Sequence, residues 1–286
     1  MNIKITSDST CDLSKEILDD HSISVVPLNV ILGVDSYSDG VDITPYDIFD
    51  YVERTGRLPK TSATSVTQYE DFFNKQLKSA DYIVHISLSS KISSSYENAL
   101  RAADAVARER IFVVDSLSLC AGQGLIAVKA ARFAAQGNPP KSVALYAERI
   151  RKNVVTSFVP DSLEYLHMGG RCSLASMMSA KLLKLHPLIV MEDGVMSPKK
   201  KYMGNMEACL KKYISDAAAA FTDYDPSICI LSNACADPAL IDNVRNHLKA
   251  AFDFETVYET TAGSTITSHC GRNTMAIFFM RKDAAD

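Results

Sequence analysis

Hydroxyl side chains are concentrated in a few short stretches of this chain, of which the richest is Ser87–Tyr96, reading Ser-Leu-Ser-Ser-Lys-Ile-Ser-Ser-Ser-Tyr. The apolar run 82–86 before it predicts a buried strand, and the apolar positions after it, such as Ala99 and Ala103, predict a helix. A strand that ends in hydroxyls just before a helix presents O–H and N–H donors at the carboxyl end of a sheet. Because helix N-termini favour negative charge, the pattern predicts an anion site, and a serine-rich loop that caps the helix is the plainer alternative.

Two other stretches carry donors of the same kind. Thr61-Ser-Ala-Thr-Ser65 is one, and Gly263–Gly271, a hydroxyl-rich run that contains His269, is the other. Gly169-Gly170-Arg171 adds a cation, and its glycines permit close approach of the backbone. A carboxylate accepts hydrogen bonds and donates none, so a set of donors suits it. We therefore predict a carboxylate-binding site whose donors are Thr61, Ser62, Ser93 and His269.

A serine-dependent esterase or thioesterase is an alternative interpretation of the same residues. Ser93 and His269 would be the nucleophile and the base, with Asp8 or Asp115 as the acid that orients the histidine. The G-x-S-x-G elbow that exposes a nucleophilic serine is absent from the sequence, and several neighbouring serines suit hydrogen bonding better than one activated nucleophile. Binding is therefore favoured over hydrolysis.

Other kinds of site have weaker support. Gly122-Gln-Gly124-Leu-Ile-Ala127 fits a dinucleotide fingerprint, but it is too far from the preceding strand and no acidic residue follows at the ribose spacing, so close helix packing is the simpler interpretation. The sequence contains no P-loop motif. Its six histidines lack metal-ligand spacing and its seven cysteines are scattered, so we expect no cofactor, no metal site and no disulfide framework.

Charge and hydropathy limit the classes of partner that the sequence predicts. The 286 residues carry 30 basic and 34 acidic side chains, a net charge of −4, and no basic stripe, which argues against nucleic acid as a partner. The first residues lack the layout of a signal peptide, and no apolar run approaches the length of a membrane span. These features predict a cytoplasmic protein.

The order of elements predicts an α/β fold with two domains. Strand–loop–helix units repeat through residues 1–159 and imply a doubly wound, mainly parallel sheet. In that half we expect a strand over 24–32, a turn over 35–40 and a returning strand over 41–43. After residue 160 the rhythm changes and a hairpin is predicted over 187–201, so residues 160–286 are expected to form a separate α/β or α+β domain. A methionine-rich helix is expected over 174–185.

Five motifs, taken in order, resemble those of the DegV family over nearly the whole chain. They are Ser7-Asp-Ser-Thr-Cys-Asp-Leu13, Lys60-Thr-Ser-Ala-Thr-Ser65, Leu88-Ser-Ser-Lys-Ile-Ser-Ser-Ser-Tyr96, Leu163-Glu-Tyr-Leu-His-Met-Gly-Gly-Arg171 and Gly263-Ser-Thr-Ile-Thr-Ser-His-Cys-Gly271. The resemblance implies a two-domain fold that holds one long-chain fatty acid between the domains. It also implies a carrier subunit that has no complete catalytic apparatus and presents the fatty acid to the separate ATP-binding subunit of a fatty acid kinase, which forms the acyl phosphate.

The resemblance also implies roles for individual residues. Thr61 and Ser93 match the hydroxyls that bind the carboxylate, and His269 matches the histidine beside it. Arg171 matches an arginine used in phosphoryl transfer or partner docking. The chain departs from the family after His269, where Cys-Gly-Arg272-Asn273 replaces the usual x-Gly-Pro-Gly. The tail of the acid is expected along the apolar face of residues 174–185, at Met177, Met178, Leu182 and Leu183.

Overall fold

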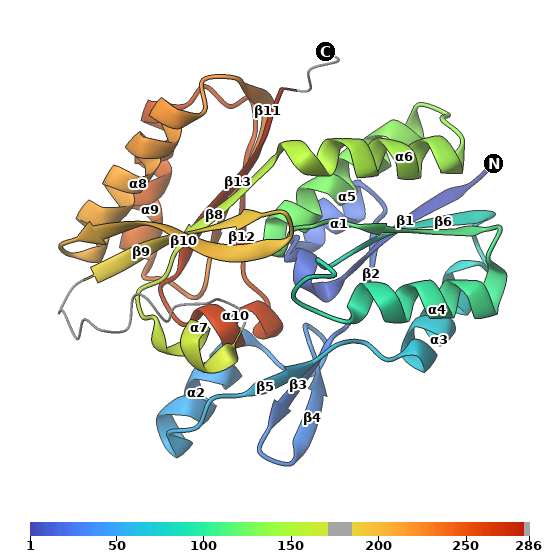
Figure 1. The fold of residues 1–286 in the computed structure, drawn as a ribbon, viewed down its shortest axis with the longest axis horizontal. Coiled ribbons are helices and arrows are strands. Elements are labelled where there is room, and N and C mark those ends of the chain that lie inside the picture. The colour runs from blue at the N-terminus through green and yellow to red at the C-terminus, as the bar shows by residue number, and fades with distance from the viewer. Residues whose placement is uncertain (171–184, 283–286) are drawn as a thin grey trace.

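A buried helix, α5 (Cys120–Ala135), lies between two β-sheets and packs against both (Figure 1). The structure is a computed structural model and describes residues 1–170 and 185–282. The first nine residues of α5, Cys120 to Val128, are all buried, as expected for a helix segment that is apolar around its circumference. An alanine side chain at Gly124 would place its Cβ 2.7 Å from the backbone oxygen of Cys11, and one at Gly122 would lie 2.3 Å from Thr156 Oγ1. The G-x-G pattern therefore serves close helix packing.

The sheet in the first half of the chain is parallel throughout and has the strand order β2-β1-β6-β7. Its strands are β1 (Ile3–Asp8), β2 (Ser24–Val26), β6 (Tyr82–Ser87) and β7 (Ile111–Asp115). Helices α3 (Val66–Gln76) and α4 (Ser95–Ala107) cover one face, and α5 with α1 (Lys15–Asp20) and α6 (Pro140–Ile150) covers the other. The predicted doubly wound sheet is confirmed.

The second sheet is mixed and has the order β10-β9-β8-β13-β11-β12. Its strands are β8 (Val154–Val159), β9 (Leu185–Glu192), β10 (Val195–Met203), β11 (Tyr224–Asn233), β12 (Val257–Thr261) and β13 (Met275–Arg281). Side chains alternate across it: Ala276, Phe278 and Met280 face α5, whereas Ile277 and Phe279 face α8 (Met206–Ala220) and α9 (Pro238–Ala251). The predicted α/β class is thus confirmed for both halves.

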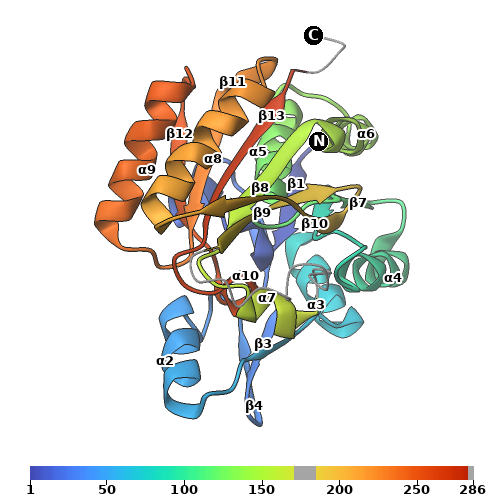
Figure 2. The ribbon, with the colours of Figure 1, turned by 60° about the vertical axis from the view of Figure 1, so that its left-hand side comes forward.

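A small antiparallel sheet, β4-β3-β5, lies below the two larger sheets with α2 (Pro45–Thr55) beside it (Figure 2). The predicted continuous strand 24–32 is wrong, because β2 ends at Val26 and β3 (Asn29–Leu32) starts after Pro27, which has no N–H for a ladder. The returning strand is β4 (Asp35–Ser38), not 41–43, since Gly33 at φ +69° lets the chain turn earlier. Part of the predicted loop after Pro59 is also a strand, β5 (Lys60–Ser62).

Short helices complete the chain. They are the 3₁₀ turns Ser9–Cys11 and Arg151–Asn153, α7 (Glu164–Gly169) and α10 (Ser264–Cys270).

The division into two domains after residue 159 stays a prediction, although β8, which ends there, hydrogen-bonds to β13 and β9 in the second sheet. The hairpin expected after residue 187 is β9–β10. The helix expected over 174–185 falls almost wholly on 171–184, outside the described residues.

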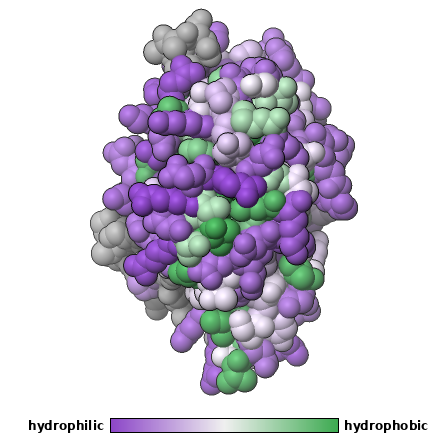
Figure 3. All heavy atoms as spheres, turned by 90° about the vertical axis from the view of Figure 1, so that its right-hand side faces the viewer, coloured by the Kyte–Doolittle hydropathy of each residue, from purple (hydrophilic) through white to green (hydrophobic). Residues whose placement is uncertain are grey.

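The face of the molecule drawn in Figure 3 is mostly hydrophilic. Figure 3 shows hydrophilic side chains over most of one face, with hydrophobic ones near its middle and its lower end. Large apolar side chains that are exposed, such as Val34, Leu145 and Met203, lie on separate elements, which is ordinary for a protein surface. In the described part of the chain, no helix is long and apolar enough to span a membrane.

Replacing Gly124 with alanine should destabilise the fold. Alanine in an exposed helix is more favourable than glycine by up to about 1 kcal/mol, but here the added methyl meets the backbone of Cys11, and overpacking costs about 1–3 kcal/mol. We expect Gly124→Ala to lower the free energy of unfolding in urea titrations. An increase in stability would contradict this packing.

Candidate functional site

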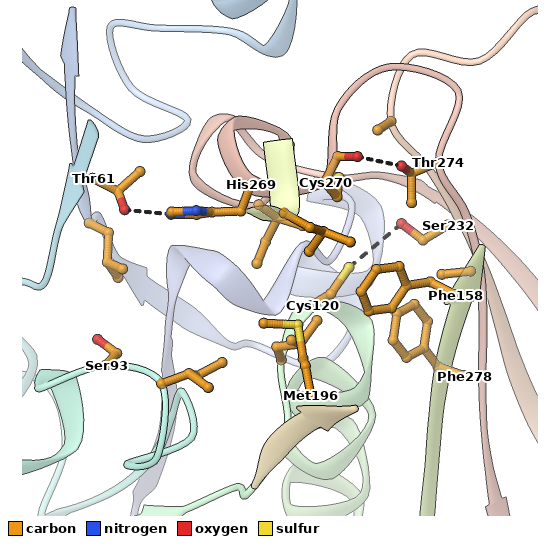
Figure 4. Close-up of a pocket in the computed structure, with 18 of the residues that line it drawn as sticks. Thr61, Ser93, Cys120, Phe158, Met196, Ser232, His269, Cys270, Thr274 and Phe278 are labelled. Atoms are coloured by element: carbon orange, nitrogen blue, oxygen red, sulfur yellow. Dashed lines mark hydrogen bonds between the residues drawn. The ribbon is translucent and has the colours of Figure 1, made fainter. Parts of the chain in front are cut away.

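An apolar cavity lies where α5, α10, β5 and the inner face of the second sheet meet (Figure 4). It contains about 800 Å³ of empty space, part of it open to solvent. The apolar side chains that line it include Leu28, Leu119, Phe158, Leu166, Met196, Ile266 and Phe278. Alternation of side chains along β8 and β13 turns Phe158 and Phe278 toward α5.

Four of the predicted site residues line this one cavity. They are Thr61, Ser62, Ser93 and His269. The Thr61 hydroxyl lies 2.8 Å from His269 Nε2, a hydrogen bond between residues 208 positions apart. Thr61 is on β5 and His269 on α10, so neither lies on a loop at the carboxyl end of the parallel sheet. Thr61, Ser93 and the ring of His269 nevertheless lie on the same side of the cavity (Figure 4).

Ser93 lies in the turn that precedes α4. Its Oγ accepts a hydrogen bond from the Ser95 N–H at 3.1 Å and lies 2.9 Å from Ser95 Oγ. Ser95 is fully buried, whereas Ser93 is half-buried beside the cavity. The turn therefore fixes Ser93 while leaving it next to the space that a ligand would occupy.

Asp8 and Asp115, the two acids considered as orienting residues for a catalytic histidine, both hold the serine-rich turn. Asp8 is completely buried and accepts hydrogen bonds from the Leu88 N–H at 2.7 Å and the Tyr69 hydroxyl at 2.5 Å. Asp115 accepts from the Ser90 N–H at 3.1 Å. Burial raises the pKa of Asp8, but the hydrogen bond and charge of His85, with the Tyr69 bond, hold that pKa below its ordinary value. The geometry thus gives these acids a positioning role for the turn.

Two buried carboxylates hold the start of α10. The Gly263 N–H donates to Asp12 Oδ1 at 2.9 Å and the Ser264 N–H donates to Asp39 Oδ1 at 2.8 Å. Acceptors here satisfy N–H groups that have no partner within the helix, and negative charge at a helix N-terminus is favourable. The sequence analysis included Asp12 only as part of a motif and did not single out Asp39. Local sequence could not predict their role, because their hydrogen bonds to Gly263 and Ser264 join segments that are far apart in the chain.

Burial raises the pKa of Asp12 well above its usual value, and the charge of Asp39 adds to this effect against the hydrogen bonds from Cys120 and Gly263. Asp12 Oδ1 can accept the Gly263 hydrogen bond whether or not the carboxyl is ionised.

Gly169, the first residue of the Gly-Gly-Arg motif, lies directly against His269. A Cβ at Gly169 would lie 2.5 Å from His269 Nδ1, so only glycine allows the end of α7 to approach the imidazole this closely. Arg272, the departure from the family pattern, lies over the Phe49 ring of α2 with 4.8 Å to its centroid. Both contacts fix the end of α10 that carries His269. Arg171, Met177, Met178, Leu182 and Leu183 lie outside the described residues.

Metal chemistry has no support from the geometry. Among residues 1–170 and 185–282, no three His, Cys, Asp or Glu side chains form a group that could hold a metal ion.

Gly169→Ala should displace His269. The added methyl cannot coexist with the present ring position, so we expect altered imidazole signals in histidine-selective NMR spectra and a lower melting temperature. Gly170→Ala is the matched control, because its Cβ would meet nothing within 4 Å and it tests only the cost of the +67° φ angle. Unchanged His269 signals in Gly169→Ala would contradict the contact.

Asp12→Asn should alter the pH dependence of stability. An acid whose folded pKa is raised binds its proton more tightly when folded, so its ionisation costs stability as pH rises above the unfolded value, near 3.9, toward the raised value. Asparagine keeps the acceptor for Gly263 and cannot ionise. The melting temperature of Asp12→Asn relative to wild type should therefore rise between pH 4 and pH 8, and a relative fall would contradict the assignment.

Comparisons with known proteins extend over almost the whole chain. The family model described as "Uncharacterised protein, DegV family" matches residues 2–282. A DegV domain-containing protein of Caldanaerobacter subterraneus is 28% identical over 282 residues, covering 98% of this chain and 99% of the relative.

Two solved structures have the same architecture. One, described under "Fatty Acid Binding of a DegV family Protein from Thermus thermophilus", gives a TM-score of 0.90 at 26% identity and covers 99% of this chain and 100% of the other. The other, a stearic acid-binding protein from Eubacterium ventriosum, gives 0.85 at 27% identity and covers 98% of each chain. The fold, the ordered motifs and the match of the family model lead to one conclusion: this chain belongs to the DegV family.

Proposed function

We propose that this chain binds one long-chain fatty acid, with the carboxylate at Thr61, Ser93 and His269 and the hydrocarbon tail in the apolar cavity. The observation that carries the proposal is that donors from three distant segments line one end of a cavity whose other walls are mostly apolar. Ser62, which also lines the cavity, is a further donor. The fatty-acid-binding relatives from Thermus thermophilus and Eubacterium ventriosum support the same ligand class.

The two ends of the ligand contribute differently. Burial of a methylene is worth roughly 0.8 kcal/mol, so about a dozen methylenes supply roughly 10 kcal/mol before the costs of binding. Hydrogen bonds to a charged group add about 1.5–3 kcal/mol each, part of which is offset by desolvation of the carboxylate. The tail therefore supplies most of the affinity, and the hydroxyls and imidazole set the position of the head group.

A carrier that presents its carboxylate to another protein fits this arrangement. The sequence contains no P-loop of its own, and the family resemblance implies a separate ATP-binding kinase subunit that converts the bound acid to an acyl phosphate. Gly169 adjoins the His269 ring, and Arg171 is two residues further along the sequence. We propose that Arg171 assists phosphoryl transfer or docking of that subunit.

Loss of a single head-group hydroxyl should separate occupancy from chemistry. In Ser93→Ala and Thr61→Ala the tail is still buried, so the purified variants should retain fatty acid, whereas phosphorylation by the added kinase subunit should fall at least tenfold because transfer needs accurate placement of the oxygen. Ser94→Ala is the matched control, since Ser94 is exposed and its side chain makes no capping bond. Mass spectrometry of extracts and acyl phosphate formation are the two measurements.

The esterase alternative makes the opposite forecast. It requires turnover of acyl esters by the chain alone and loss of that turnover in Ser93→Ala. Purified protein that holds no fatty acid, or that hydrolyses esters in a Ser93-dependent way, would contradict the carrier proposal. Normal phosphorylation in both Ser93→Ala and Thr61→Ala would contradict the head-group assignment.

A further inference from the structure

One position on the cavity wall breaks the apolar pattern of its strand. Along β11, Ile228 and Ile230 face α5, and Ser232 is the next residue on that face. Alternation therefore places a hydroxyl where the pattern calls for an apolar side chain. Ser232 is only 2% exposed and lines the cavity.

The Ser232 hydroxyl has a weak partner. Its bonded neighbour is the Cys120 thiol, at 3.8 Å between the oxygen and the sulfur, and thiols are poor donors and acceptors. Burial without a good hydrogen bond is unfavourable for a hydroxyl. Figure 4 shows this pair beside Phe158, on the side of the cavity away from Thr61 and Ser93.

A second hydroxyl lies next to this pair. Thr260 on β12 is in register with Ser232 and thus faces the same side of the sheet. Thr260 Oγ1 is buried, and within 1–170 and 185–282 it has no hydrogen-bond partner. Thr274, by contrast, also lines the cavity but already donates to the Cys270 carbonyl oxygen at 2.8 Å. Two poorly satisfied hydroxyls, those of Ser232 and Thr260, therefore lie together on this part of the sheet.

We propose that Ser232 and Cys120 form a polar subsite for an oxygen atom on the acyl chain, so that the ligands of this cavity include hydroxylated long-chain fatty acids. A ligand hydroxyl can accept from Ser232 and donate to the Cys120 sulfur, whose own S–H is hydrogen-bonded to Asp12, so Ser232 gains a stronger partner than the thiol. In the rest of the cavity the same hydroxyl would lose its hydrogen bonds to water without replacement. The subsite would therefore select both the substituent and its position along the chain.

The inference rests on the proposed binding of fatty acids, and one titration series tests the two separately. Delipidated protein is titrated by calorimetry with stearate and with a panel of hydroxystearates that differ in the position of the hydroxyl. Wild type should bind at least one isomer about fivefold more tightly than stearate, as one net hydrogen bond implies. In Ser232→Ala every hydroxystearate should bind no better than stearate.

Thr274→Val is the matched control, because it removes a hydroxyl from the same cavity that is already bonded to Cys270. Thr274→Val should keep the wild-type ratio between the dissociation constant of stearate and that of the preferred hydroxystearate. Wild type that binds stearate more tightly than every isomer, or a preference that survives in Ser232→Ala, would overturn the subsite. If wild type bound neither stearate nor any hydroxystearate, that result would instead overturn the proposed function, and the subsite with it.

Discussion

The attachment of α10 to two buried acids is the constraint on which the site depends. Asp12 and Asp39 accept hydrogen bonds from the first N–H groups of this helix, and Asp12 is 251 residues away from its partner Gly263. Hydrogen bonds to charged groups contribute about 1.5–3 kcal/mol each. Because α10 has only seven residues, its start determines where His269 lies at its end. These contacts, together with those of Gly169 and Arg272 near the other end of α10, place the imidazole beside Thr61.

The other elements form the remaining walls of the cavity beside α10. The inner face of the second sheet and α5 provide the apolar walls, since the glycines and alanines of α5 bring both sheets close to it. Asp8 and Asp115 hold the turn that carries Ser93. The polar end of the cavity is therefore built by buried acids that do not line it, and the apolar end by strand alternation.

Local patterns predicted much of this. The parallel sheet followed from repeated strand–loop–helix units. Residue type alone grouped Thr61, Ser62, Ser93 and His269 as hydrogen-bond donors, and the four line one cavity, while their role in binding a carboxylate stays a prediction. Contacts between distant segments left no local signal, so Asp39 and the bond between Thr61 and His269 were missed. The position of β4 depended on one left-handed residue, Gly33, and that of β3 on the missing N–H of Pro27.

The most direct test of the central claim is carbon NMR of stearate labelled at the carboxyl carbon and bound to the delipidated protein. If Thr61, Ser93 and His269 hold the carboxylate, bound stearate should give a signal distinct from free stearate. That signal should shift in His269→Gln while the ligand remains bound. The same signal in wild type and His269→Gln, with both proteins saturated, would contradict the account.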